Sequence, residues 1–508
     1  MQFRSILFAD KEPELLTETP VFFHDLQLDY LLERILEPVK GYQTEKYYYT
    51  FPREEKLILF RQQVGKDMES EELCTVLRRF CHRLKESRKI YNYSLKSEGE
   101  MQAAAYHLQA ASLYWEAVLE LEKKLGGCSL ESEGMLGLAG YVKQHLAELR
   151  ERGFAAALKR ADEFFSGLSF QLSVDTDKLM VEESVEFQKN YFEELAELLG
   201  QEPEKTDTGI QDIFPEPLEP SYLEQMLVRL LKKSRPEVFR EIKEFYKCFP
   251  VIYSDILLRF EEEVQFYLSF QNFKLRTKAK GYSMTTPVIS REQGFSGRGV
   301  YDIALVWKQE DSSYQVVANE FTMKNRPSFF VVTGPNQGGK TTFARSMGQA
   351  VYFTLMGLSV NAECFRTPLF QGISTHFEAE ETLQSNSGKL KEEINRLIPM
   401  MAQNQNRSSF VILNELFTTA TTHDAMIMGR KVMESFLRRE CYGIYVTHIQ
   451  ELAEETEEII SLVAQLAPGE ESRRTYRMLP MKAQGFGYSE ALVKKFRLDY
   501  ADIVRRLS

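Results

Sequence analysis

The sequence has few cysteines and no closely spaced pair of them. The six cysteines among 508 residues form no Cys-x-x-Cys motif, which suits a reducing compartment and offers no zinc site. They are Cys74, Cys81, Cys128, Cys248, Cys364 and Cys441. The cysteine pattern therefore favours a protein of the cytoplasm.

Long apolar runs are missing as well. The longest uncharged stretch, residues 346–362, contains Gln349 and Asn361, and it is too short and too polar to span a bilayer. Near the N-terminus, Asp10, Lys11 and Glu12 come before any long apolar run, so no signal peptide is expected. We expect a cytoplasmic protein that does not insert into a membrane.

The sequence has no surplus of positive charge. With 63 Lys and Arg against 74 Asp and Glu, the net charge is −11, which argues against a surface coated for nucleic acid. Any nucleic-acid contact must therefore be local. The best candidate is the group Lys274, Arg276, Lys278 and Lys280, although the pattern favours a solvated segment at a domain boundary.

Glycine and proline are too sparse, and hydrophobic residues too frequent at 43%, for a disordered or fibrous protein. From about Leu57 to Leu158, apolar residues recur every three or four positions, which indicates helices. The clearest helix covers Ala103 to Leu121 and ends at Gly126-Gly127, and a second periodic run covers Met135 to Leu158. Residues 168–174 alternate between apolar and polar, which predicts a strand.

Residues 201–219 are rich in Pro, Glu, Asp and Thr and predict an exposed loop, after which residues 222–270 return to helical spacing. Residues 281–299 are rich in Gly, Ser, Thr and Pro, which indicates a domain boundary. We predict a short N-terminal segment (1–50), a helical domain with a small strand-bearing insertion (51–290) and a second domain (299–508).

In the second domain, strand-like and helix-like runs alternate, which predicts an α/β fold with a largely parallel sheet. The runs are Ser328 to Thr333, Thr341 to Leu358, Ser408 to Leu413, Ala425 to Arg439 and Cys441 to Thr447.

The first of these strands leads into a glycine-rich motif, Gly334-Pro335-Asn336-Gln337-Gly338-Gly339-Lys340-Thr341, which fits G-x-x-x-x-G-K-[ST]. The glycines allow backbone N–H groups to surround a phosphate at a helix N-terminus. Lys340 is expected to reach the β- and γ-phosphates, and the Thr341 hydroxyl to ligate Mg²⁺. The motif therefore predicts binding of a nucleoside triphosphate.

Two further strands end in polar residues. Phe410 to Leu413 leads into Asn414-Glu415, where a carboxylate beside the phosphates can polarise the attacking water. Gly443 to Val446 leads into Thr447-His448, where the histidine can hydrogen-bond to the γ-phosphate or its water. We interpret Glu415, His448 and Lys340 as candidate catalytic residues.

Together, these motifs resemble the ATPase domain of the MutS family. The resemblance covers roughly residues 300 to 508 and includes Thr333 to Thr342, Asn414-Glu415, Thr421-Thr422-His423-Asp424, Thr447-His448 and Gly485 to Ala491. It implies an α/β P-loop ATPase of the ABC class that uses ATP and Mg²⁺, with Thr342 in the phosphate loop. It also implies that Val317 and Asn319, just upstream, hold the adenine.

The same resemblance implies a dimer in which each nucleotide is capped by a segment from the other subunit. That segment is expected to be Ser387 to Glu392, with Ser387 and Gly388 facing the phosphates, although Lys389 replaces the family's usual aromatic residue. Asn414 likewise replaces the family's aspartate on the Mg²⁺ side, and an amide oxygen is a weaker acceptor there. We therefore expect slow hydrolysis.

The front half resembles the family's core and lever region only in being a long helix-rich block with a small strand-bearing insertion. No motif indicates an N-terminal mismatch-recognition domain. We expect a dimeric ATPase that uses ATP to clamp a DNA structure in repair or recombination, without reading mismatches directly. The alternative is an ATP-dependent switch on a ribonucleoprotein such as a stalled ribosome, or a nucleotide-gated protein scaffold.

Overall fold

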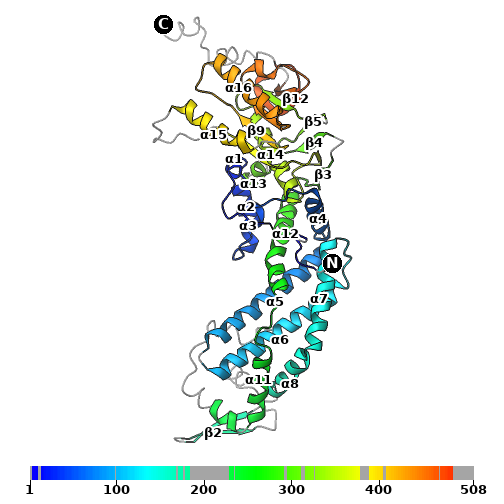
Figure 1. Cartoon of the computed structure of the whole chain (residues 1–508), viewed down its shortest axis with the longest axis vertical. Helices are drawn as coiled ribbons and strands as arrows, with labels where there is room; N and C mark the ends of the chain where they lie inside the picture. The colour runs from blue at the N-terminus through cyan, green and yellow to red at the C-terminus, as the bar shows by residue number, and fades with distance from the viewer. Residues whose placement is uncertain are drawn as a thin grey trace. The chain divides into compact units, whose positions relative to one another are not determined.

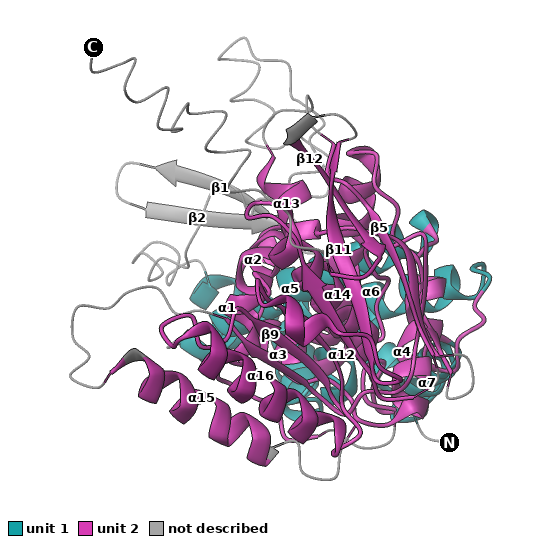
Figure 2. Cartoon of the chain, turned by 90° about the horizontal axis from the view of Figure 1, so that it is seen from above, with its two compact units in different colours: residues 1–3, 71–129, 136–258 teal, residues 4–70, 130–135, 259–508 magenta. Residues whose placement is uncertain are grey.

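The computed structural model describes most of the chain and divides it into two compact units (Figure 2). The residues outside the description are 1–2, 10–12, 98, 167–169, 176–177, 184–227, 234, 291–293, 310–314, 325, 378–387, 404–407, 468–469 and 484–508. The first unit comprises residues 1–3, 71–129 and 136–258, and the second comprises residues 4–70, 130–135 and 259–508.

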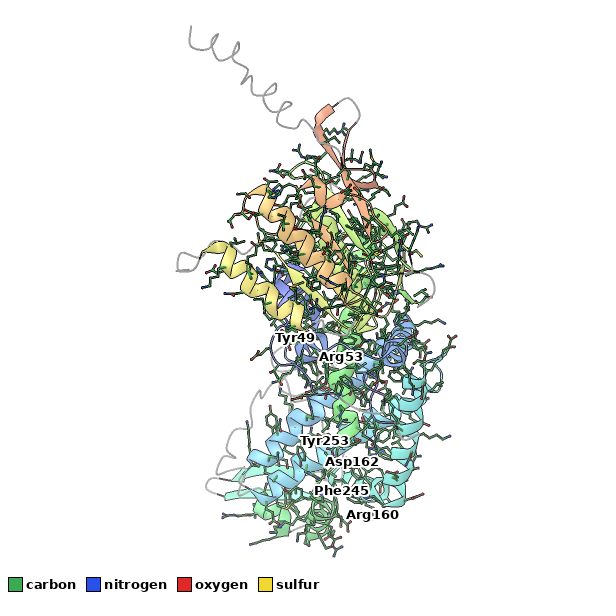
Figure 3. All side chains as sticks on the ribbon, turned by 45° about the horizontal axis from the view of Figure 1, so that its top comes forward. Tyr49, Arg53, Arg160, Asp162, Phe245 and Tyr253 are labelled. Carbon is green, nitrogen blue, oxygen red and sulfur yellow. The ribbon has the colours of Figure 1, made fainter. Side chains whose placement is uncertain are left out.

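The first unit is helical. Its elements are α5 (Glu71–Lys96), α6 (Glu100–Leu125), most of α7 (Glu133–Glu151), α8 (Phe154–Ser166), the strands β1 (Phe170–Asp175) and β2 (Lys178–Glu183), a short helix at 228–233, α11 (Pro236–Cys248) and the start of α12 (Asp255–Ala279). Aromatic contacts join parts of this unit, and Figure 3 labels two of the residues that make them, Phe245 and Tyr253. Phe245 packs against Phe154 with ring centroids 5.5 Å apart, and Tyr253 meets Tyr114 edge-on at 5.1 Å.

The helical predictions for this unit are largely confirmed. Helix α6 buries the predicted face and ends at Leu125, with Gly126 as its C-cap. The predicted run from Met135 to Leu158 is instead two helices, because Gly153 adopts a left-handed backbone (φ 78°) that ends α7 and starts α8. The predicted strand is β1, which pairs antiparallel with β2. The predicted loop at 201–219 lies outside the described residues.

The second unit mixes helices with two sheets (Figure 1). Its helices are α1 (Phe22–Asp25), α2 (Leu28–Leu36), η1 (Glu37–Val39), α3 (Glu45–Tyr49), α4 (Glu55–Asp67), the remainder of α12, α13 (Ile303–Lys308), α14 (Lys340–Met356), α15 (Lys389–Gln403), α16 (Thr422–Leu437) and η3 (Gln450–Ala453). Its strands are β3 (Val288–Ile289), β4 (Phe295–Val300), β5 (Asn319–Met323), β6 (Phe329–Thr333), β7 (Cys364–Thr367), β8 (Ile373–His376), β9 (Phe410–Asn414), β10 (Tyr442–Val446), β11 (Ile459–Ala467) and β12 (Glu470–Pro480).

The larger sheet has the strand order β12-β11-β6-β10-β9-β8. Strands β11, β6, β10, β9 and β8 run parallel, and β12 is antiparallel to β11. The smaller sheet has the order β3-β7-β4-β5. The parallel arrangement predicted for strands 329–333, 410–413 and 443–446 is confirmed, because β6 and β9 both pair with β10.

Both faces of the larger sheet are covered. Phe329, Val331, Val411, Leu413 and Tyr445 share one face with apolar residues of α15 and α16, which lie beside β9 in Figure 1. The intervening residues of each strand face the opposite side of the sheet, because side chains alternate along a strand. On that side, Ile412 lies against Gly348 of α14. Strands buried on both faces read as continuous apolar runs, which is why sequence reasoning located them accurately.

The structure divides the chain elsewhere than at the predicted boundary near residue 299. The N-terminal residues belong with the second unit: the Ile6 amide donates to Glu263 on α12 at 2.9 Å, and the Tyr352 hydroxyl of α14 donates to the Tyr48 carbonyl at 2.8 Å. Residues 281–299 hold β3 and much of β4, so their composition marks loops inside a unit.

The predicted basic group lies at the C-terminal end of α12 and makes contacts within its own unit. Lys274 donates to Glu69 at 2.6 Å and to Ser359 at 3.1 Å, and Arg276 donates to Glu37 at 3.1 Å while lying over the Trp307 ring. Lys280 Nζ also lies over the Trp307 ring, so three of the four cations have contacts inside the second unit. Within the described residues, no helix is long and apolar enough to cross a membrane.

Candidate functional site

The glycine-rich motif forms the loop between β6 and α14. Gly334 (φ 128°), Gln337 (φ 58°) and Gly339 (φ 87°) all have left-handed backbones, and Gly339 is the N-cap of α14. A side chain at Gly338 would place its Cβ 2.9 Å from the Pro335 carbonyl oxygen, so this position accepts only glycine without rearrangement. The first amides of the helix have no partner within α14, so the loop and helix start together present N–H donors to an anion.

Lys340 is the first residue of α14 and is 5% exposed. Its ammonium donates to the carbonyl oxygens of Gly334 at 3.1 Å and Pro335 at 3.2 Å, which holds it under the loop. Burial lowers the pKa of Lys340, and the negative charge of Glu415 partly opposes this shift. The hydrogen-bond partners of the ammonium are neutral carbonyl groups, which suits a site for phosphate.

Asn414 ends β9 and contacts the start of α14. The Thr341 hydroxyl donates to Asn414 Oδ1 at 2.9 Å, which brings together the two residues predicted to face Mg²⁺. Hydroxyl and amide oxygens are acceptable ligands for a hard cation. Among the described residues, no group of three or more His, Cys, Asp or Glu side chains is placed to hold a metal ion. The pair thus fits Mg²⁺ only if phosphate oxygens and water complete the coordination.

Glu415 follows Asn414 in an unusual backbone conformation. Both Glu415 (φ 52°) and Phe417 (φ 62°) lie in the left-handed region, which costs a non-glycine residue about 1–2 kcal/mol. The Glu415 amide donates to the Val446 carbonyl at 2.8 Å, so the end of β10 holds this turn. The Glu415 side chain is half-buried and lines the same pocket as Lys340 and Thr341.

Parallel pairing places the ends of three strands at one edge of the sheet. Val446 is in register with both Val332 and Asn414, so the glycine-rich loop, Asn414-Glu415 and Thr447-His448 all follow at that edge. His448 differs from the other candidates, because its side chain is exposed and is not among the residues that line the pocket.

One open pocket brings most of the candidate residues together. Its lining includes Val317, Asn319, the residues from Asn336 to Thr342, and Glu415. Asn319 also holds strand β12: its side-chain amide donates to the Tyr476 carbonyl at 3.1 Å and accepts from the Met478 amide at 2.8 Å. Gly334 and Pro335 are absent from the lining and contribute the carbonyls that hold Lys340.

Sequence reasoning missed several residues of the pocket wall. Tyr301, Asp302, Leu305, Gln309, Gln315 and Tyr476 line it in addition to the predicted residues. Asp302 is buried, forms a 2.6 Å ion pair with Arg345 on α14 and caps α13. Asp302 could have been recognised as a helix N-cap, because aspartate is favoured at that position and its side chain accepts from the Leu305 amide three residues later. Nothing in the sequence links it to the glycine-rich loop.

The other two predicted segments are only partly described. Ser387 lies outside the described residues, and Gly388 is exposed just before α15, where its carbonyl accepts from the Lys391 amide at 2.9 Å. Thr421 is the N-cap of α16, and its hydroxyl oxygen accepts from the Asp424 amide at 3.2 Å. The Thr421 to Asp424 motif therefore starts a helix.

Part of the chain is similar in sequence to known proteins. Residues 330–483 match the family model for MutS domain V. The DNA mismatch repair protein MutS of Thermotoga maritima is 26% identical over 224 residues, which is 44% of this chain and 27% of that protein. The DNA mismatch repair proteins MSH6 of Arabidopsis thaliana and MSH3 of Pyricularia oryzae are each 30% identical over 25% of this chain, covering 10% and 11% of their own lengths. The similarity thus spans about a quarter or less of each relative.

Proposed function

We propose that this chain, a member of the MutS family by the match of residues 330–483 to MutS domain V, binds ATP with Mg²⁺ in the pocket described above and hydrolyses it. The observation that carries the proposal is the convergence of Lys340, Thr341 and Glu415 on one pocket. A phosphate-binding loop, an oxygen pair for a cation and a carboxylate are what phosphoryl transfer to water requires.

Each group has a distinct role in this proposal. The loop amides and the Lys340 ammonium hold the β- and γ-phosphates, and Lys340 moves from the carbonyls of Gly334 and Pro335 to phosphate oxygens. Glu415 accepts a hydrogen bond from the attacking water and orients it. Thr341 and Asn414 would hold Mg²⁺, which neutralises charge on the phosphates when bound.

We further propose that the active form is a homodimer in which each chain caps the nucleotide of the other. Gly388, at the start of α15, is exposed and does not line the pocket of its own chain, which agrees with a cap supplied by a partner. Specific ATPase activity should then rise with protein concentration across the range in which light scattering detects dimers. A constant specific activity from a monomer would contradict the shared site.

DNA is the proposed substrate. The three relatives named above are DNA mismatch repair proteins, and they lend no support to the ribonucleoprotein alternative. Because the chain carries a net charge of −11, the contact must use a local surface instead of a general positive field. ATP binding then closes the dimer on DNA, and hydrolysis releases it.

The test is an electrophoretic mobility shift with homoduplex, mismatched, four-way-junction and single-stranded DNA. With a slowly hydrolysed ATP analogue, we expect at least one structure to be retained more tightly than without nucleotide. A Lys340→Met variant is the matched control and should lose this dependence on nucleotide. Ribosome co-sedimentation that depends on ATP, with no retention of any DNA, would contradict the DNA proposal and favour the ribonucleoprotein.

A further inference from the structure

A carboxylate on α15 reaches the turn that carries Glu415. Glu393 Oε1 accepts a hydrogen bond from the Phe417 amide at 2.7 Å, although the two residues lie on separate elements. His376 Nε2, at the end of β8, lies 3.5 Å from the same oxygen. The His376 side chain is 3% exposed and that of Glu393 is 18% exposed, so the contact is largely shielded from water.

The hydrogen bond from the Phe417 amide to Glu393 lies in a turn with an unfavourable backbone conformation. Glu415 and Phe417 both have left-handed backbones, a state that persists only where the surroundings fix it. The Val446 carbonyl fixes one end of the turn by accepting from the Glu415 amide at 2.8 Å. Glu393 fixes the other end through the Phe417 amide. The 415–417 turn is thus held between one backbone anchor and one side-chain anchor.

Glu393 lies beside a buried apolar cluster, where a carboxylate is unfavourable unless it has hydrogen-bond partners. The neighbouring core contains Leu397, Leu416, Phe417 and Tyr445, all of them buried. The Tyr445 pKa is raised, mainly by burial and in part by the negative charge of Glu393. A carboxylate against such a cluster costs desolvation that an apolar side chain would avoid, so its hydrogen bond to the Phe417 amide and its contact with His376 must together offset that cost.

We propose that Glu393 is a positioning residue for hydrolysis: it holds the 415–417 turn so that the Glu415 carboxylate points at the attacking water. The inference rests on the proposed function, in which Glu415 orients that water. α15 begins directly after Gly388, so any shift of this helix on capping would be transmitted to the 415–417 turn through Glu393. Glu393 therefore connects the capping segment to the water-orienting residue.

A matched pair of variants of similar size tests this role. Glu393→Gln keeps an oxygen that accepts from the Phe417 amide, whereas Glu393→Met fills the same space with a thioether sulfur, which is only a weak acceptor. We expect Glu393→Met to lower kcat about tenfold, because small displacements of a reacting group have effects of this order or larger. Glu393→Gln should stay within about threefold of wild type, and KM for ATP should change little in both.

Two controls separate positioning from general damage. Asn395→Ala changes an exposed residue on the same helix and should leave kcat unchanged. In a Glu415→Gln background, Glu393→Met should cause no further loss, because the residue that it positions is already disabled. Fluorescent-ATP binding and thermal unfolding establish that each variant is folded.

The outcomes distinguish this inference from the proposed function. A wild-type protein that binds and hydrolyses no ATP overturns the function and the role of Glu393 with it. Wild-type turnover together with an equally active Glu393→Met overturns the role alone. Equal losses in the Gln and Met variants, or a full further loss in the Glu415→Gln background, also overturn it, since the effect would then not pass through the Phe417 bond to Glu415.

Discussion

Glu415→Gln is expected to lower steady-state ATP turnover by at least about tenfold while leaving ATP affinity unchanged. Assistance from a general base contributes on the order of 10² to 10⁴ to such reactions, and an amide cannot accept the proton. The substitution keeps the size of the side chain and the backbone bond from the Glu415 amide to Val446. The ATP-bound state should therefore accumulate, which single-turnover kinetics with equilibrium binding will measure.

The matched control for this variant is Glu454→Gln, which removes an exposed carboxylate elsewhere in the second unit. It should hydrolyse ATP at the wild-type rate. Unchanged turnover in Glu415→Gln would remove Glu415 from the water-orienting role. Since the His448 side chain lies outside the pocket lining, attention would then turn to a residue supplied by the partner chain.

The loop, Asn414 and Glu415 lie at the ends of neighbouring strands, as the sequence pattern predicts, and the reason is physical. Each lies at the end of a strand buried on both faces or directly after it, and such strands appear as short apolar runs. Once β6, β9 and β10 are parallel neighbours, their following residues meet at one edge without further information. The Thr341 to Asn414 hydrogen bond follows from that register.

Other features depend on contacts that have no local signature. Glu393 lies on an amphipathic helix among other charged residues, and only the tertiary structure brings it to the Phe417 amide. Tyr476 reaches the pocket from an edge strand held by Asn319. The grouping of residues 4–70 with 259–508 likewise arises from packing such as Tyr352 on Tyr48, while composition reports only local turns.

Lys340→Met is expected to abolish ATP binding in the range where wild type is saturated. The variant removes the one cationic side chain among the described residues that line the pocket, so Mg²⁺ and neutral N–H and O–H groups alone would have to offset the charge of the phosphates. Methionine keeps the length and apolar body of the buried side chain. The nucleotide-free variant should unfold near the wild-type temperature, because losing two carbonyl hydrogen bonds is offset by no longer burying an ammonium group.

Thermal unfolding with and without MgATP is the direct measurement. A ligand at a hundredfold its Kd stabilises the folded state by about 2.7 kcal/mol, so the wild type should gain several degrees in Tm and the variant none. The pKa of Lys340 is lowered by burial, so its ammonium is lost at a lower pH than that of an ordinary lysine. Wild-type affinity should therefore begin to fall before the ordinary lysine range as pH rises, and Lys431→Met, an exposed control on α16, should show the same profile as wild type. If MgATP protects Lys340→Met as strongly as wild type, residues 334–341 are a glycine-rich turn that does not bind phosphate.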